Sequence, residues 1–323
     1  MTTSQPWASY PMGPALRHIL GISETDYTGD QAQRPEEATK EAFEDYLSQA
    51  LLSNTSLSKE EIVDLIEELT SMNFPGLCLE LASANNHHQL NDDFRAMLGL
   101  GSASMMEAEL DNAISFLNRA HSLEAEELAP YVNLAEVYFF QQNDDQAYLW
   151  ALSGLKLDPS HRRLWEIIAR IEWEKNEGEA AQKVKQIAQK LNSFSGLSLA
   201  AHMLDENDDL LRAQFLEEHY KAGGREEDFL IEWTAALGQA GQFERVAQIL
   251  WEAENLPQFN GKAPWQLYLH AMQANMALEK FDSAQEVLDR LNSKSISLTD
   301  AVQKDLNTLK DEIDENLNKN ERE

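Results

Sequence analysis

Cysteine and histidine are the first residues to examine for chemistry in this sequence. The single cysteine, Cys78, stands in "GLCLEL" among leucines, where a buried and unreactive thiol is expected rather than a nucleophile. His87 and His88 are adjacent, so on a helix they would point about 100° apart and could not share one metal ion without other ligands. Neither residue type therefore predicts a catalytic or metal site.

Phosphate-binding and hydrolytic motifs are absent from the sequence. The glycine pair Gly223 and Gly224 precedes Arg225 and lacks the lysine and serine that complete a phosphate loop. The sequence has no paired-glycine dinucleotide fingerprint, no HExxH pair and no nucleophile elbow. Acidic pairs are common because the whole chain is acidic, so they do not mark a site. We therefore predict that the protein is not an enzyme and uses neither a metal nor a cofactor.

Length and charge restrict the classes of partner. A chain of 323 residues is too long for one ordinary core and should form two domains or an elongated array. It carries 56 acidic residues against 26 lysines and arginines, a formal charge of −30. This charge repels nucleic-acid phosphates and anionic membranes, so we expect no direct nucleic-acid binding. The acidic residues either solvate helix surfaces or attract a basic partner.

Hydropathy gives no sign of a membrane-spanning segment. No run approaches eighteen consecutive apolar residues, and the first twenty residues lack the basic start and apolar stretch of a secretory signal. One cysteine cannot build a disulfide framework. We expect a cytoplasmic protein with no membrane span.

The elements that would position a binding site are helices from Pro35 onward. Ser58 followed by Glu61 is a capping box at the start of "SKEEIVDLIEELTSM", and Pro75 suits the first turn of a following helix. No stretch alternates β-branched and polar residues as a strand would. The predicted fold class is all-α.

A 34-residue period runs through the middle of the chain. With Leu128 as the first position, an aromatic residue, Tyr131, stands at position four and Pro159 at position thirty-two. Positions eight, twenty and twenty-seven of this frame and of the frames starting at Phe94 and Arg162 carry only glycine or alanine. These residues are Ala135, Ala147 and Gly154; Gly101, Ala113 and Ala120; and Ala169, Ala181 and Ala188. Three consecutive units in one register indicate a helical repeat.

This pattern resembles the tetratricopeptide repeat (TPR), a helix pair whose small residues let neighbouring helices approach closely. The resemblance implies a right-handed helical-repeat solenoid of antiparallel helix pairs. Weaker units start near Glu227 and Trp265, displaced from each other by 38 residues because about four are inserted around "LPQFNGKAP". We predict N-terminal helices with a degenerate repeat over 35–93, three in-register repeats over 94–195, degenerate and TPR-like repeats over 196–298, and a capping helix over 299–323.

The first 34 residues contain three of the nine prolines and no sustained period, so they are predicted to be an irregular or disordered tail. Within this tail, "PALRHILGI" places Leu16, Ile19 and Leu20 at helical spacing. This segment could occupy the groove in cis, recruit a second protein, or be loosely attached.

The resemblance also implies a binding face. In TPR proteins, positions two, five, six, nine, twelve and thirteen of each first helix face a ligand groove. The residues carried over to these positions and predicted to bind a partner are Met105, Met106, Val132, Asn133, Glu136, Phe139, Phe140, Arg163, Arg170 and Trp173. The alternative is that the aromatic residues among them pack between helices. Of the positions that form the chaperone-tail clamp of one TPR subclass, Asn133 alone matches fully, so no complete clamp is expected.

Two hypotheses of function follow. The first is a non-enzymatic scaffold, adaptor or chaperone-like protein that holds a peptide or partner subunit in its groove. The second is an acidic protein that binds or buffers a basic partner, for example a nucleic-acid-binding protein, through its charged exterior.

Overall fold

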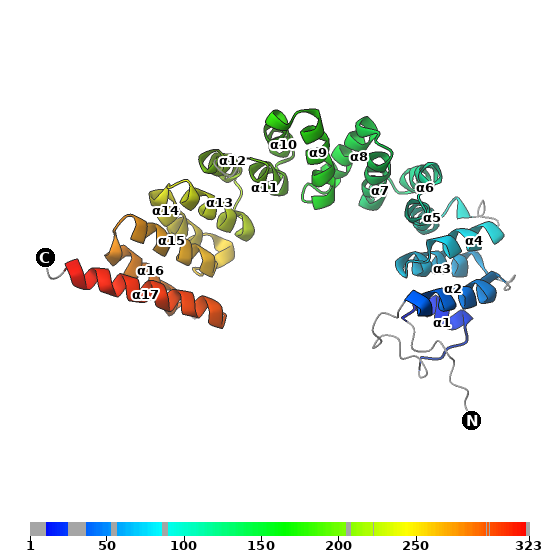
Figure 1. The fold of residues 1–323 in the computed structure, drawn as a ribbon, viewed down its shortest axis with the longest axis horizontal. Coiled ribbons are helices and arrows are strands. Elements are labelled where there is room, and N and C mark those ends of the chain that lie inside the picture. Colours follow the sequence, from blue (N-terminus) through cyan, green and yellow to red (C-terminus); the bar gives the residue numbers. More distant parts are fainter. Residues whose placement is uncertain are drawn as a thin grey trace, which may run out of the picture. The chain divides into compact units, whose positions relative to one another are not determined.

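The computed structural model describes residues 11–24, 37–52, 57–85, 90–204, 208–221, 223–294, 296 and 298–320 (Figure 1). Over these residues the chain is helical and contains no strand, as the predicted all-α class requires. The chain divides into two compact units, which we describe separately. The N-terminal unit contains Met1–Asp158 and Glu166–Ile168, and the C-terminal unit contains Pro159–Trp165 and Ala169–Glu323. The unit boundary therefore falls within the block predicted over 94–195. His87 and His88 lie outside the described residues.

The described residues of the N-terminal unit form eight helices: α1 (Pro14–Ile19), α2 (Glu37–Leu52), α3 (Lys59–Ser71), α4 (Pro75–Ala84), α5 (Phe94–Met106), α6 (Leu110–Leu123), α7 (Leu128–Phe140) and α8 (Asp144–Leu157). The C-terminal unit contains most of α9 (Arg162–Lys175), followed by α10 (Glu177–Leu191), α11 (Phe194–His202), α12 (Asp209–Lys221), α13 (Glu227–Gln239), α14 (Phe243–Glu254), the short helix η3 (Pro257–Phe259), α15 (Trp265–Ala277), α16 (Phe281–Ser293) and α17 (Asp300–Asn320). The predicted capping box of α3 is present, with Ser58 and Glu61 bonded reciprocally.

The predicted repeat register is confirmed by the helix boundaries. The five residues predicted to begin units are the first residues of α5, α7, α9, α13 and α15, namely Phe94, Leu128, Arg162, Glu227 and Trp265. Four second helices begin 16 residues later, at 110, 144, 243 and 281 after starts at 94, 128, 227 and 265. The predicted insertion contains η3 and the left-handed residue Asn260. First helices also pack side by side, α3 on α5, α5 on α7, and α13 on α15.

Small residues at the repeat positions are buried where helices approach closely. Ala113, Ala120, Ala135 and Ala147 have no exposed surface. At Gly101 a Cβ atom would lie 2.6 Å from Leu117 Cδ2 on α6, which is closer than carbon atoms pack. The glycine therefore lets α5 and α6 pack at short range, which is the physical reason for the pattern seen in the sequence.

The structure corrects the predicted irregular tail at residues 11–24. There, Pro14–Ile19 form α1, and Met12, Leu16, Leu20 and Ile22 are buried in the core of the N-terminal unit. The Glu68 carboxylate on α3 accepts hydrogen bonds from the Ala15 and Leu16 amides, at 2.7 and 3.0 Å. The segment "PALRHILGI" therefore docks in cis, on the core of its own unit. The remaining tail residues, 1–10 and 25–34, lie outside the described residues.

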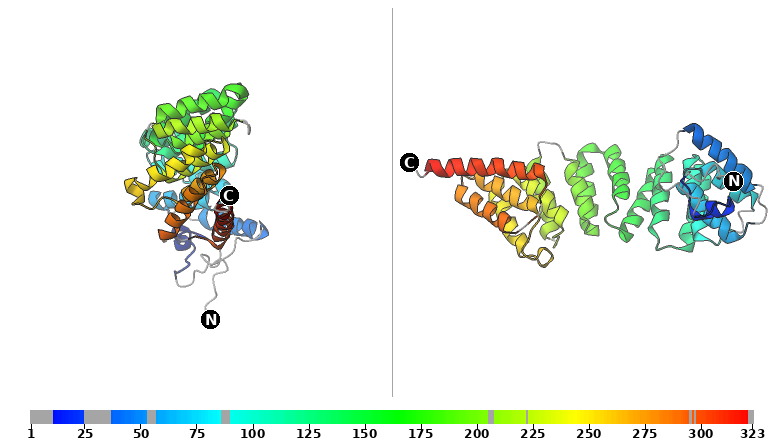
Figure 2. Two further views of the ribbon diagram at one scale, coloured as in Figure 1. Left: turned by 90° about the vertical axis from the view of Figure 1, so that its left-hand side faces the viewer. Right: turned by 90° about the horizontal axis from the view of Figure 1, so that it is seen from below.

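The last helix, α17, packs against α16 within the C-terminal unit. The right-hand view of Figure 2 shows it lying along the edge of the preceding helices. Its apolar contacts come from Leu306 and Ile313, which are buried, and most of its other side chains are exposed. Such a polar outer surface suits a cap on a repeat array, a role that stays a prediction.

Cys78 gives a prediction about thiol chemistry. It is fully buried on α4 within the N-terminal unit, and burial raises the pKa of its thiol to about 11. The thiol is therefore protonated at pH 8, and we expect the native protein to react with a disulfide reagent on the order of 100-fold more slowly than the urea-unfolded chain. Absorbance of the released thiolate measures both rates. Equal rates would show that Cys78 is accessible and reactive in the native fold.

Candidate partner-binding sites on the first helices

Large apolar side chains are exposed at equivalent places on successive first helices. Met106 ends α5 and Phe140 ends α7, both at position thirteen, and their exposed fractions are 46% and 56%. On α9 the corresponding turn carries Trp173, which is 39% exposed. Exposed aromatic and methionine side chains are common at sites of protein contact, because covering them removes apolar surface from water.

The other predicted residues of α5 and α7 are partly buried. Met105 packs against a small core formed by Ala113, Leu117, Leu134 and Val137. Val132, Glu136 and Phe139 are also half-buried, so packing between helices accounts for part of their surface. These side chains are only partly accessible to solvent, unlike those of Met106 and Phe140.

Asn133 links two predicted groove positions. Its Nδ2 donates to Ser102 Oγ across α7 and α5 at 3.1 Å, and the Ser102 hydroxyl donates to Leu98 O at 3.0 Å. The amide that matches the chaperone-tail clamp is therefore used inside the fold.

The remaining predicted residues lie on α9 in the C-terminal unit. Arg163 is half-buried, and Arg170 is exposed and forms an ion pair with Glu174 one turn further along the helix. The predicted set is therefore divided between the two units. The structure brings together only the part carried by α5 and α7, which pack against each other.

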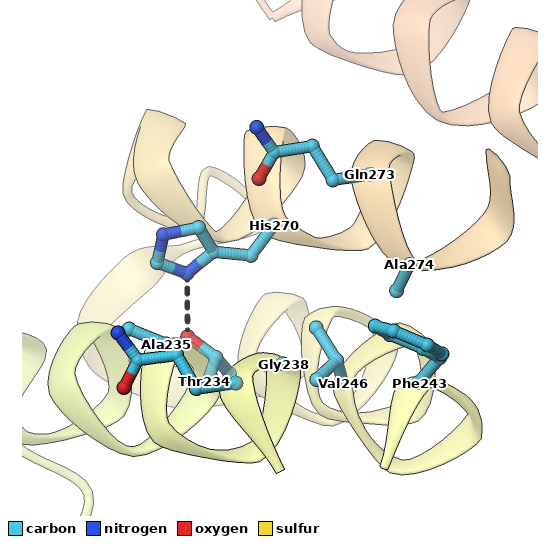
Figure 3. Close-up of a pocket in the computed structure, with 9 residues that line it drawn as sticks. Thr234, Ala235, Gly238, Phe243, Val246, His270, Gln273 and Ala274 are labelled. Carbon is cyan, nitrogen blue, oxygen red and sulfur yellow. Dashed lines mark hydrogen bonds between the residues drawn. The ribbon is translucent and has the colours of Figure 1, made fainter. Parts of the chain in front are cut away.

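A pocket of about 360 Å³ opens in the C-terminal unit between α13, α14 and α15 (Figure 3). Its described lining consists of Thr234, Ala235, Gly238, Gln239, Phe243, Val246, His270, Gln273 and Ala274. In the repeat frames that start at Glu227 and Trp265, five of these residues occupy the groove positions of α13 and α15: Ala235, Gly238, Gln239, His270 and Gln273. The pocket is thus on the face that the TPR resemblance assigns to ligands.

His270 gives this pocket its hydrogen-bonding character. Burial lowers the pKa of the imidazole, which keeps it neutral at physiological pH. Its Nδ1 lies 2.8 Å from Thr234 Oγ1, and the Thr234 hydroxyl donates to Leu230 O at 2.8 Å. With the Thr234 hydroxyl donating to this carbonyl, the tautomer protonated at Nδ1 donates to Thr234 Oγ1 and leaves Nε2 as an acceptor. Figure 3 shows Nε2 on the side of the ring away from Thr234.

Gly238 provides the open space of the pocket. A Cβ atom at this position would meet nothing within 4 Å, in contrast to the crowded Gly101. The described lining contains no lysine, arginine or acidic residue. The site combines a small apolar surface with the amides of Gln239 and Gln273 and the imidazole acceptor. These groups suit an uncharged, hydrogen-bonding ligand such as a peptide backbone.

Sequence reasoning missed this pocket, although a signal was present. The predicted groove residues lie in the units starting at Phe94, Leu128 and Arg162, and none lies in those starting at Glu227 and Trp265. Applying the same positions there would have named His270 and Gln273. The depth of the pocket, which depends on Gly238 and on the spacing of α13 and α15, could not have been read from the pattern.

Over its described part, the chain has no cluster of three or more histidine, cysteine, aspartate or glutamate side chains placed to hold a metal ion. In the same residues, no helix is long and apolar enough to cross a membrane.

Comparison with known proteins places the chain near TPR structures at low similarity. A TPR protein from Parabacteroides merdae is 14% identical, with 77% of this chain and 97% of that chain covered and a TM-score of 0.36. YrrB, described as a TPR protein with an unusual peptide-binding site, is 12% identical over 64% of this chain and 89% of its own, with a TM-score of 0.28. Acl4, the assembly chaperone of RpL4, is 12% identical over 82% and 99%, with a TM-score of 0.31.

No family model matches the sequence. No curated protein matches it significantly either. The class of protein is therefore defined by the register of the repeats in this chain and by the packing of its helices. It is an all-α protein of repeated helix pairs, similar in pattern to tetratricopeptide repeats.

Proposed function

We propose that this chain is a non-enzymatic interaction scaffold of the cytoplasm that holds a peptide or partner subunit against its first helices. The pocket on α13 and α15 carries this proposal, because its hydrogen-bonding groups are uncharged and stand at groove positions around an open glycine. Met106 and Phe140 support it in the N-terminal unit, since both are exposed at equivalent positions of adjacent first helices.

Filling the pocket tests the proposal. In the Gly238→Leu variant a leucine should occupy the open space without a clash, and replacing a helical glycine should leave the free energy of unfolding unchanged or raise it by up to ~1 kcal/mol. We expect a partner captured from native lysate by the wild type, and identified by mass spectrometry, to be lost or strongly reduced. Thermal unfolding followed by circular dichroism verifies the fold.

A matched variant tests the N-terminal unit. Phe140→Ser removes an exposed ring and should leave unfolding nearly unchanged while it weakens capture of a partner that also uses α5 and α7. Equal recovery of the same partners by the wild type, Gly238→Leu and Phe140→Ser would contradict groove binding.

The second candidate, binding of a basic partner through the acidic exterior, is favoured by the net charge of −30. Salt separates the two functions. Binding by distributed surface charge should weaken steeply between low and high ionic strength, because exposed charges are screened. Binding in the uncharged α13–α15 pocket should change little over the same range.

A further inference from the structure

A second pocket lies between α6, α7 and α8 of the N-terminal unit, with a volume of about 550 Å³. We call it the α6–α8 pocket. Its main wall comes from α8, which is the second helix of its pair, while His121 adds a ring from α6 and Tyr131 adds one from the first turn of α7. None of its lining residues stands at a groove position of a first helix. It is therefore separate from the faces used in the proposed function.

Three rings form a fixed wall in this pocket. The His121 ring lies 4.8 Å from Tyr131 and 5.1 Å from Trp150, and Tyr131 lies 5.6 Å from Trp150, all centroid to centroid and edge to face. The Tyr131 hydroxyl donates to Ala125 O at 2.8 Å, which ties the wall to the loop between α6 and α7. Because the rings hold one another in place, the pocket is formed before any ligand arrives.

Two leucines beside these rings are exposed. Leu149 is 57% exposed and Leu157 is 43% exposed, and both line the α6–α8 pocket together with Trp150. A ligand side chain placed against them would remove this apolar surface from water. One large apolar side chain, such as a leucine or an aromatic, fits in this pocket and leaves room for neighbouring residues of the same segment.

The surroundings of the pocket are acidic. Glu124, Glu126 and Glu127 are exposed in the loop that Tyr131 contacts, and Asp145 is exposed next to the lining residue Gln146. Among the described lining residues, Lys156 is the one lysine or arginine. This charge distribution favours a cationic ligand. It disfavours a second copy of the chain, because each copy carries a net charge of −30.

We infer that the α6–α8 pocket binds a cationic segment of a partner protein, which places one large apolar side chain against the rings and the two exposed leucines, and lysines or arginines against the acidic loop. Affinity comes from the buried apolar side chain, and the acids select for positive charge and speed the encounter. The site acts independently of the groove.

A synthetic peptide can test this inference. The probe is a fluorescently labelled nonapeptide of lysine and alanine with one central leucine, and anisotropy reports binding to the full chain. We expect the Leu149→Ser, Leu157→Ser double variant to bind it at least roughly tenfold more weakly. Replacing the central leucine of the probe by serine should cause a similar loss. Lys156→Glu should strengthen binding severalfold at low salt, since it removes the one lining cation.

Phe140→Ser is the matched control, because it removes another exposed apolar side chain of the same unit. It should bind the probe as the wild type does, which separates this site from the groove. The inference is overturned if the probe does not bind, or if its affinity is unchanged when serine replaces its central leucine. It is also overturned if the double variant has a native circular dichroism spectrum and binds the probe with wild-type affinity. Sedimentation that shows a dimer lost on substituting Leu149 and Leu157 would instead assign the pocket to a second copy.

Discussion

Replacing Trp165 by alanine is expected to destabilise the C-terminal unit by about 3–5 kcal/mol, since this removes a fully enclosed indole. Trp165 is 1% exposed on α9, and its Nε1 donates to Pro159 O at 2.9 Å. Its ring packs directly on the backbone of α11, where a Cβ atom at Gly196 would lie 2.5 Å from the ring. Urea denaturation followed by far-UV circular dichroism measures the loss.

Trp173 on the same helix gives a matched control. It is 39% exposed, so Trp173→Ala should lower the free energy of unfolding by less than about 1 kcal/mol. Gly196→Ala should destabilise the wild type through clashes with the indole and with Ala188 Cβ, and less in the Trp165→Ala background, because only the clash with Ala188 then remains. Equal losses for the two tryptophans, or additive losses for Trp165 and Gly196, would contradict this packing.

Removing the buried carboxylate of Glu254 is the second large effect. Its side chain is 4% exposed on α14, and it forms ion pairs with Arg290 on α16 at 2.6 Å and with Lys294, the residue after α16, at 3.6 Å. It also accepts a hydrogen bond from the Tyr268 hydroxyl on α15, and this contact together with burial raises the pKa of Tyr268. The Glu254 carboxylate on α14 therefore links this helix to both α15 and α16.

We expect Glu254→Ala to lower the free energy of unfolding by about 2–4 kcal/mol. The variant leaves the buried Tyr268 hydroxyl without its acceptor and two cations without a counter-ion. The partial exposure of Arg290, 40%, keeps the value below that of a fully buried pair. Urea denaturation measures the change, and Glu254→Gln separates loss of charge from loss of the acceptor.

Glu315 provides the control for surface charge. It pairs with Lys319 at 2.8 Å on α17, but both side chains are exposed to solvent. Glu315→Ala should leave the urea midpoint unchanged, because an exposed ion pair contributes little. If Glu254→Ala were as mild as Glu315→Ala, the buried cluster would not hold α14, α15 and α16 together.

The repeat frame is the part of this fold that could be predicted from local pattern. Positions one of five units coincide with five helix starts, and Trp165 fills position four as an enclosed aromatic residue. These features depend on the helical period and on the sizes of side chains within one helix pair. Both can be read from one continuous segment of the sequence. Exposure was harder to predict: of the paired candidates Phe139 and Phe140, only Phe140 is largely exposed.

The all-α class, the register of helix pairs and the small residues at their contacts could be predicted from the sequence, because they follow from spacing along one segment. Three further features are visible only in the folded chain: α1 docks on Glu68, Glu254 meets Tyr268 and Arg290, and Gly238 opens a pocket beside His270. Each brings together residues from different helices, and their contacts depend on how closely those helices pack, which no local spacing encodes.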